Sequence, residues 1–475
     1  MKNLSSFLDH PIFYVLSEIG KSHNQPVYVV GGFIRDILLF NKAKKEVDIV
    51  VVGNLLPIVE DFARIFSRGE YAIYENFGTA MVCAGDYRIE FVSARKESYR
   101  GESRKPFVQP ATLEEDQLRR DFTVNAFYLS LNQENFGTLI DPFNGQADLE
   151  KKILRTPTNP DITFSEDPLR MLRAVRFATQ LDFQIAPDAL ESIKKNVERL
   201  KIVSQERITD EFNKIILTPI PSKGLRLLFD TRLLHQFFPE LVRLQGIEII
   251  NGIGHKDNFY HTLKVLDNVA KVSDNLWLRW AAILHDIAKP ITKKFDEKNG
   301  WSFHGHDDKG AKMVPGIFKR LRLPLNEKMK YVQKLVELHL RPIALVDEEV
   351  TDSAIRRLIV DAGEYLEDLL LLCKADITTR DTQKLQRYLA NFEKVEQRIK
   401  EVEERDRLRN WQPPITGEMV MQYFNLKPGP LVGLIKNAVR EAILEGEIPN
   451  EESIAYQYMI EKGKKILQEQ GITTN

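Results

Sequence analysis

The sequence predicts an α+β protein in which a small mixed sheet near the N-terminus is followed by all-helical domains. β-Branched and apolar runs alternate with glycine turns over roughly the first 150 residues. From Ile153 onward strand signals disappear, and apolar residues recur at helical spacing. A chain of 475 residues is also too long for a single core, so we expect several domains.

Composition restricts the classes of function. The formal charge is −1, with 43% hydrophobic and 28% charged residues, which excludes a globally basic nucleic-acid binder. RNA contacts must then come from local patches, such as RKESYRGESRK at 95–105. No apolar run approaches the roughly 18 residues of a membrane helix, and the N-terminus lacks a signal-peptide pattern. Two cysteines are too few for a disulfide framework or a zinc motif, so we expect a cytoplasmic protein without a membrane partner.

The first elements are an amphipathic helix over 5–24 and a strand–turn–helix–strand unit over 27–53. Gly31 and Gly32 end the first strand, where backbone N–H groups can approach a phosphate and the following helix N-terminus favours an anion. Arg35 and Asp36 fall in the first turn of that helix. This unit therefore predicts a phosphate-binding turn.

The second strand of this unit carries two acids. Glu46 and Asp48 are two residues apart, so they point to the same face of the sheet. Adjacent carboxylates repel each other, and a divalent cation is the usual reason for such an arrangement. The alternative is a surface strand with two solvated acids.

Further strands follow a helix near 56–66. We expect them at 72–74 and 79–83, with a hairpin at Gly85-Asp86 and a returning strand at 87–94 that carries Glu90. Glu90 is either a third acid of the site or a solvated residue on an edge strand. Residues 93–117 are polar and rich in charge, glycine and proline, which predicts a mobile loop.

The loop ends in RRDFTVNA at 119–126. Adjacent arginines suit a polyphosphate, because each offers a planar fork of donors. An ordinary helix start with Asp121 as N-cap would explain the same residues.

A helix is expected to open at Ser165, with Pro168 in its first turn. Asp167 and Arg170 would then share one helix face. A cap and an ion pair are the structural alternative. Glu206, Arg207, Glu211 and Lys214 form a charged stripe on a later helix, which we interpret as structural.

A second constellation lies in the middle of the chain. His261 sits early in a helix, an apolar run over 276–284 leads to His285-Asp286, and Asp376 follows in LLLLCKADI. Imidazole and carboxylate are the ligands of divalent transition metals. His304 and His306, in FHGHDDKGAKM at 303–313, are candidate additional ligands or substrate contacts.

The first set of motifs resembles the class II tRNA nucleotidyltransferase and bacterial poly(A) polymerase superfamily. The resemblance rests on Gly-Gly-x-x-Arg-Asp at 31–36, the acid-x-Asp strand, RRDFTVNA and Glu-Asp-x-x-Arg at 166–170. It implies template-independent addition of C and A, from CTP and ATP, to the 3′ end of tRNA. Two Mg²⁺ ions would be held by Glu46 and Asp48, joined by Glu90 as a third catalytic acid. The first acid of the family is usually Asp, and this chain has Glu46 there.

The same resemblance implies the nucleotide contacts and the domain boundaries. We expect a nucleotidyltransferase head over 1–150, a nucleotide-selecting neck over 151–240, an HD domain over 241–400 and an RNA-binding tail over 401–475. The expected nucleotide-binding residues are Gly31, Gly32, Arg35, Arg119, Arg120, Asp121, Asn125, Asp167, Arg170, Arg173 and Arg176.

The second constellation resembles the HD phosphohydrolase superfamily, to which FHGHDDKGAKM and His339 also correspond. A divalent transition metal bound by His261, His285, Asp286 and Asp376, and a metal-dependent hydrolase activity, are what this resemblance implies. Two alternatives to CCA addition stay open. One is a poly(A) polymerase or an enzyme that adds only CC or only A; the other is an HD phosphohydrolase whose head has become an RNA-binding module.

Overall fold

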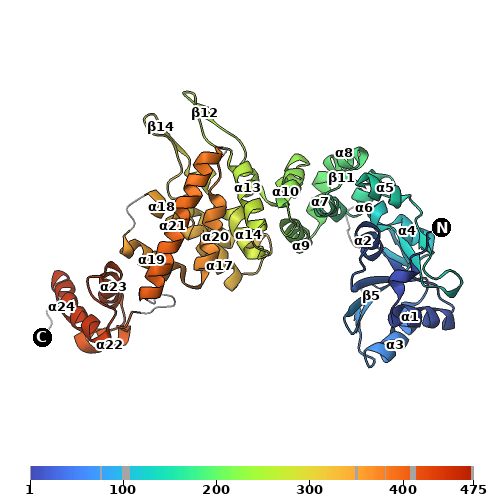
Figure 1. Ribbon diagram of the computed structural model, residues 1–475, viewed down its shortest axis with the longest axis horizontal. Coiled ribbons are helices and arrows are strands. Elements are labelled where there is room, and N and C mark those ends of the chain that lie inside the picture. Colours follow the sequence, from blue (N-terminus) through green and yellow to red (C-terminus); the bar gives the residue numbers. More distant parts are fainter. Residues whose placement is uncertain are drawn as a thin grey trace. The chain divides into compact units, whose positions relative to one another are not determined.

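The computed structural model describes residues 2–74, 78–98, 107–347, 351–379, 381–406 and 413–471. The chain divides into two compact units, Met1–Val242 and Arg243–Asn475, coloured blue to green and green to red in Figure 1. Most of the basic segment 95–105 lies outside the described residues. No helix among the described residues is long and apolar enough to cross a membrane.

The first unit is built on a seven-stranded mixed sheet with strand order β3-β4-β5-β2-β1-β8-β9. Its strands are β1 (Val27–Val30), β2 (Glu46–Val51), β3 (Ala72–Tyr74), β4 (Thr79–Ala84), β5 (Tyr87–Ser93), β8 (Tyr128–Ser130) and β9 (Leu139–Ile140). The pair β2–β5 is parallel, and the other pairs are antiparallel. The predicted mixed sheet and α+β class are thus confirmed.

Helices α1 (Pro11–Ser22), α2 (Gly32–Phe40) and α3 (Leu55–Phe66) accompany this sheet. The predicted helix over 5–24 is wrong in its first part. A short 3₁₀ turn, Ser5–Leu8, precedes α1, which begins at Pro11. Proline has no N–H to donate, so it fits the first helical position and ends any helix that precedes it.

The mobile loop predicted over 93–117 is wrong at its two ends, and its middle, 99–106, lies outside the described residues. Its ends form an antiparallel ribbon of β6 (Arg95–Ser98) and β7 (Phe107–Pro110), followed by helix α4 (Leu113–Leu118). Thr112 caps α4 in a capping box with Glu115. The loop prediction considered only the charge, glycine and proline content of the segment, and so missed this helix start.

Helices then dominate the first unit up to Val242. They are α5 (Gly145–Lys151), α6 (Pro160–Glu166), α7 (Leu169–Leu181), α8 (Pro187–Asn196), α9 (Gln205–Ile216), α10 (Pro221–Asp230), α11 (Leu233–Phe237) and α12 (Pro239–Val242). Two-residue strands β10 (Ile153–Leu154) and β11 (Gln184–Ile185) pair in parallel among them, so the segment is not wholly helical.

The second unit is also mainly helical. Its helices are α13 (Asn258–Ala270), α14 (Leu276–Leu284), α15 (Lys289–Thr292), α16 (His306–Arg320), α17 (Glu327–Leu338), α18 (Arg341–Asp347), α19 (Asp352–Ala362), α20 (Leu366–Asp376), α21 (Thr382–Asp406), α22 (Gly417–Phe424), α23 (Pro430–Glu445) and α24 (Glu452–Glu469). Two small hairpins, β12–β13 (Ile249–Ile250 and Ile253–Gly254) and β14–β15 (Lys294–Asp296 and Gly300–Ser302), interrupt them. The last three helices share a core of their own around Phe424, Ile435 and Met459.

Candidate functional site

Three acids lie on one face of the sheet in the first unit. Glu46 and Asp48 are exposed on β2, whereas Val47 between them is buried. Asp48 is in register with Glu90, which is exposed on the neighbouring parallel strand β5. The structure thus brings all three predicted acids to one surface, and the register sets Glu90 beside Asp48.

The environment of Asp48 favours its protonated form. Burial, and repulsion first by Glu90 and then by Glu46, raise the pKa of Asp48 to about 6, while Arg120 and Arg173 oppose the shift. The side chain remains accessible to solvent on one face of β2, where the neighbouring acids repel it. A cation between the acids would relieve that repulsion.

The glycine turn faces this acid. Gly31 has φ +73, and a Cβ built on it would lie 3.6 Å from Asp48 Oδ2. Such a backbone conformation is easy only for glycine. Helix α2 starts directly after this turn, and the N–H groups of its first turn have no acceptor within the helix.

The side-chain amide of Asn125 links Arg35 to Asp121 through hydrogen bonds. Arg35 is buried, donates to Asp36 Oδ1 through Nε at 2.8 Å and to Asn125 Oδ1 through Nη1 at 2.8 Å. The Asn125 amide in turn donates to Asp121 Oδ1 at 3.3 Å. These predicted nucleotide-binding residues are therefore brought together as a buried chain of polar contacts.

That chain continues into the helices that follow the sheet. Asp121 Oδ2 accepts a hydrogen bond from Arg173 Nε on α7 at 2.7 Å, and Arg173 Nη2 lies 2.6 Å from the same oxygen. Although burial alone would raise the pKa of Asp121, the Arg173 guanidinium lowers it below its usual value. At the other end, Lys44 Nζ lies 2.5 Å from Asp36 Oδ2. We name this series, Lys44–Asp36–Arg35–Asn125–Asp121–Arg173, the polar chain.

Asp116 holds the adjacent arginines in place. Its carboxylate is fully buried and accepts from Arg119 Nε at 2.9 Å, from Arg120 Nη2 at 2.7 Å and from the Tyr128 hydroxyl at 2.6 Å. Burial would raise the pKa of Asp116, but the two guanidinium groups outweigh burial and hold the pKa well below its usual range. Arg119 and Arg120 are therefore positioned by an acid that the sequence pattern did not indicate.

Asp167 and Arg170 differ from the prediction. Helix α6 ends at Glu166, and Asp167 has extended backbone angles, so the two residues do not share a helix face. The Asp167 carboxylate accepts from the Leu169 N–H at 3.2 Å and lies 3.7 Å from Arg207 Nη2. Arg170 is buried and donates to the carbonyl of Arg119 at 2.6 Å. In this structure Arg170 braces RRDFTVNA against α7.

Arg176 lies one turn beyond Arg173. It pairs with Glu211 of α9, with Nη1 3.2 Å from Oε1, and stacks on Phe177 at 4.2 Å from the ring centroid. Arg35 and Arg173 each lie 5.3 Å from the same ring. Three guanidinium groups thus lie close to the ring of Phe177.

The second unit gathers histidines and carboxylates in its interior. His261 on α13, His285-Asp286 after α14 and Asp376 at the end of α20 come together. His261 Nε2 lies 2.8 Å from Asp376 Oδ1 and 3.5 Å from Asp286 Oδ2. His285 Nε2 lies 3.3 Å from Asp286 Oδ2. Against the effect of burial, these carboxylates raise the pKa of His285 to about 10.

Two further histidines reach Asp286 from other helices. His306 at the start of α16 is buried, and its Nε2 lies 3.1 Å from Asp286 Oδ1. His339 at the end of α17 lies 4.0 Å from the same oxygen. His304, the other candidate in this segment, is exposed and is not among the groups of potential metal ligands in the described residues.

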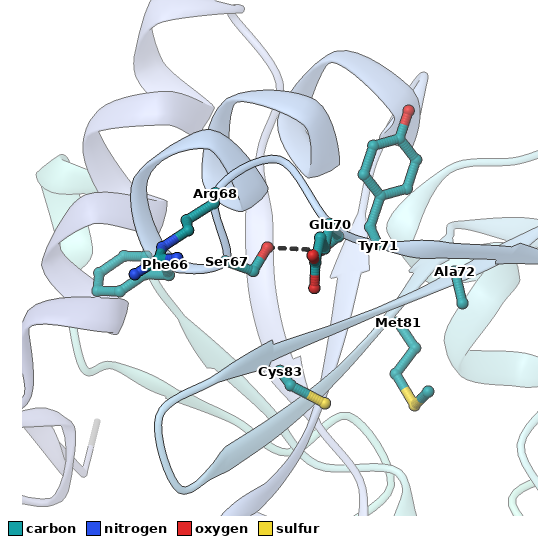
Figure 2. A pocket seen from close by; sticks show the side chains of 8 residues that line it. All are labelled: Phe66, Ser67, Arg68, Glu70, Tyr71, Ala72, Met81 and Cys83. Atoms are coloured by element: carbon teal, nitrogen blue, oxygen red, sulfur yellow. Dashed lines mark hydrogen bonds between the residues drawn. The ribbon is translucent and has the colours of Figure 1, made fainter.

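One hollow of the first unit is lined by none of these residues. Figure 2 shows that Phe66, Arg68, Tyr71, Met81 and Cys83 line it, between the end of α3 and strands β3 and β4. Only Glu70 supplies a carboxylate there. We assign no function to it.

Family models match three stretches of the chain. A poly(A) polymerase head domain matches 27–155, a probable RNA- and SrmB-binding site of polymerase A matches 182–244, and an HD domain matches 258–380. The A-adding tRNA nucleotidyltransferase of Deinococcus radiodurans is 34% identical over 362 residues, covering 73% of this chain and 79% of the relative. The chain belongs to the tRNA nucleotidyltransferase and poly(A) polymerase family.

Other members of this family are similarly related. The Multifunctional CCA protein of Shewanella frigidimarina is 33% identical over 378 residues, covering 74% of this chain and 84% of the relative. Among solved structures, a CCA-adding enzyme with ATP has a TM-score of 0.64 at 23% identity, covering 97% of this chain and 99% of that one. That likeness supports the fold.

The side chains that the sequence did not single out are mostly partners of predicted ones. Asp116 stands in a run of three acids, and Tyr128 within an apolar strand, where neither has a distinguishing pattern. Lys289 lies three residues after Asp286 and donates to Asp286 Oδ2 at 2.6 Å. Its i,i+3 spacing could have identified it.

Proposed function

We propose that this transferase adds the terminal C and A nucleotides to the 3′ end of tRNA from CTP and ATP. The observation that carries the proposal is the shared face of Glu46, Asp48 and Glu90, directly beside the Gly31 turn. The named relatives, an A-adding enzyme and Multifunctional CCA proteins, support it. The reaction is attack of the RNA 3′-hydroxyl on the α-phosphate, with release of pyrophosphate.

We propose that Glu46, Asp48 and Glu90 hold Mg²⁺. The donor set fits this ion, because hard carboxylate oxygens are its preferred protein ligands, and because burial together with repulsion from Glu90 and Glu46 raises the pKa of Asp48. Mg²⁺ bound there would assist deprotonation of the 3′-hydroxyl and stabilise charge on the leaving pyrophosphate. The longer Glu46 side chain places its carboxylate about one methylene further from the strand than an aspartate would.

The triphosphate is proposed to lie over the Gly31 turn and the arginines. The first-turn N–H groups of α2 and the forks of Arg119 and Arg120 offer donors for its oxygens. Arg173, which reaches Asp121 and influences the Asp48 carboxyl, links this end of the nucleotide site to α7. Asp116 orients the two arginines, so the donors are in place before the nucleotide arrives.

Nucleotide choice is proposed to involve Asp167 and Arg170. Cytosine and adenine both present an amino donor next to a ring-nitrogen acceptor, whereas uracil and guanine present a carbonyl next to an N–H. A carboxylate can accept from the amino group, and a guanidinium can donate to the ring nitrogen, of cytosine or adenine. Because Arg170 bonds to the Arg119 carbonyl in this structure, its use for a base requires release of that contact.

A deciding experiment uses purified full-length protein and two tRNAs. One lacks the three terminal nucleotides and the other ends in C-C. We expect CTP and ATP together to complete the first tRNA, and ATP alone to complete the second. ATP incorporation into the second tRNA only would identify an A-adding enzyme, the alternative favoured by the Deinococcus radiodurans relative. A long A tail on either tRNA would identify a poly(A) polymerase.

For the second unit we propose a metal-dependent phosphohydrolase activity. The carboxylates of Asp286, which is buried, and of Asp376, which is partly exposed, form with His261 and His285 a donor set suited to a divalent transition metal. Such an ion, when bound, would supply an activated water for hydrolysis. Hydrolysis of p-nitrophenyl phosphate that depends on added Mn²⁺, Co²⁺ or Ni²⁺ would support this activity, and its absence with every ion would refute it.

Two free thiols, Cys83 and Cys373, fit a reducing cytoplasm, where we place both activities.

A further inference from the structure

The strand order places the acids of the head between two different surfaces. Strand β2, which carries Asp48, lies between β1 and β5. The Gly31 turn follows β1, so the proposed triphosphate site lies on that side of the acids. In phosphoryl transfer the attacking and leaving oxygens are roughly in line. Pyrophosphate that leaves on the β1 side therefore requires an RNA 3′-hydroxyl that arrives from the β5 side.

A hollow lies on the β5 side of the acids. It is lined by Tyr74, Thr79, Met81, Arg88, Glu90 and Arg95. It shares only Met81 with the hollow of Figure 2, and its volume of about 420 Å³ is within the range of ligand sites, about 300–1,000 Å³. Helix α3 does not cover it, because the ring of Phe62 meets that of Phe91 on the opposite face of the sheet. Glu90 belongs both to this hollow and to the group of acids, so a molecule bound here reaches the reaction site.

Arg88 brings a cation to this hollow. It lies two residues before Glu90 on β5, so the two side chains share a face about 7 Å apart along the strand. Arg88 Nε donates to Met81 Sδ at 2.9 Å, and Met81 stands directly opposite Glu90. A thioether is a weak acceptor, and Arg88 forms no ion pair with a carboxylate among the described residues. Because a nucleotide's 3′-hydroxyl and 5′-phosphate are separated by one ribose, Arg88 can reach the 5′-phosphate of a nucleotide whose hydroxyl lies at Glu90.

Tyr74 brings an aromatic surface to the same hollow. It lies opposite Thr79 at the end of β3 and is 47% exposed. Its ring contacts no other aromatic ring in the part of the chain that the structure describes. Bases of single-stranded RNA stack on such rings whatever their identity, because every base has a π-face. The terminal nucleotide of the RNA changes after each addition, so a stack suits it better than base-specific hydrogen bonds.

We propose that this hollow binds the terminal nucleotide of the RNA that is being extended, with Arg88 on its 5′-phosphate and Tyr74 stacked on its base. This inference rests on the proposed nucleotide addition and gives its second substrate a site of its own. Both side chains are exposed, so the head should fold without them.

The contact to Arg88 is tested with ATP and two versions of a tRNA that ends in C-C. One is unmodified, and the other carries a neutral methylphosphonate between its last two nucleotides. For the unmodified protein we expect the methylphosphonate to lower kcat/KM for the tRNA about tenfold or more, as the loss of a charged hydrogen bond does. Arg88→Ala should lose a similar factor with the ordinary tRNA and then be nearly indifferent to the methylphosphonate. Its KM for ATP should be unchanged, since ATP lies on the other side of the acids.

Two further variants complete this test. Arg88→Lys keeps a cation and should remain sensitive to the methylphosphonate. The matched control is Arg64→Ala, because Arg64 is exposed on α3 and pairs only at the surface, 3.0 Å from Asp61. It should behave as the unmodified protein with both tRNAs. An equal loss on methylphosphonate substitution in the unmodified protein and in Arg88→Ala overturns the phosphate contact, even if Arg88→Ala is slow.

The stack on Tyr74 is tested with the same tRNA after removal of its terminal base. The missing base should slow the unmodified protein about fivefold or more and Tyr74→Ala much less, whereas Tyr74→Phe should behave as the unmodified protein. An equal loss in the unmodified protein and in Tyr74→Ala overturns the stack. No addition of A to the ordinary tRNA by the unmodified protein overturns the proposed function and this site together.

Discussion

Asp48 faces the Gly31 turn and is in register with Glu90, so its carboxylate should be indispensable for chemistry. We expect Asp48→Ala to remove nucleotide addition from CTP and ATP while tRNA affinity, measured by filter binding, stays within a fewfold of the unmodified protein. Glu46→Asp should keep activity, since a carboxylate remains on the same face. Unchanged turnover in Asp48→Ala would remove this residue from the metal site.

Asp116 should act through Arg119 and Arg120. Asp116→Asn removes the charge that both guanidinium groups face, and a charged hydrogen bond contributes about 1.5–3 kcal/mol. We expect KM for CTP and ATP to rise roughly ten- to a hundredfold, with tRNA affinity little changed. Tyr128→Phe, which removes one hydroxyl from the same cluster, is the control and should raise KM much less. Equal effects of the two variants would show that the cluster serves stability alone.

The acids and arginines could be predicted from the sequence because strand alternation and adjacent charges are local patterns. Glu46 and Asp48 share a face by their spacing alone. Asp116 could not be predicted, since its importance arises from burial beneath a strand twelve residues later, where Tyr128 meets it. Nothing local separates it from Glu114 and Glu115.

The junction of α6 and α7 shows why the expected helix start at Ser165 was wrong. The residue before a proline disfavours helical angles, so Asp167 becomes extended and Pro168 opens the next helix instead of extending the previous one. Asp167 and Arg170 consequently point to different partners. Residues three apart in sequence do not share a helix face when a proline between them ends one helix and begins another.

Arg170 at this junction has two expected effects. Arg170→Ala removes its hydrogen bond to the Arg119 carbonyl, which should slow incorporation of all four nucleotides. If Arg170 also reads the base, the loss should be larger for CTP and ATP than for UTP and GTP, by about tenfold or more. Single-nucleotide kinetics with each triphosphate will measure both. If incorporation of all four nucleotides slows by the same factor, Arg170 only holds the Arg119 backbone in place, and other residues select the base.

The two units carry separate constellations, and their activities should therefore separate. His285→Ala combined with Asp286→Ala removes ligands that belong wholly to the second unit. We expect the variant to lose any metal-dependent phosphatase or cyclic phosphodiesterase activity and to retain CCA addition at a rate close to that of the unmodified chain. Loss of CCA addition in a folded variant would show that the second unit is required for both.

The polar chain also constrains recombination between relatives. Five of its members, from Lys44 to Asp121, precede residue 150, and Arg173 follows it. A chimera that takes residues 1–150 from this chain and the following helices from a relative keeps Asp121 but replaces Arg173. If the new residue is not cationic, the buried Asp121 carboxylate loses its ion-pair partner, which costs several kcal/mol. Crossovers near residue 150 should thus yield poor enzymes unless the donor supplies an arginine at the position of Arg173. Crossovers after α7, which keep the series intact, should be tolerated.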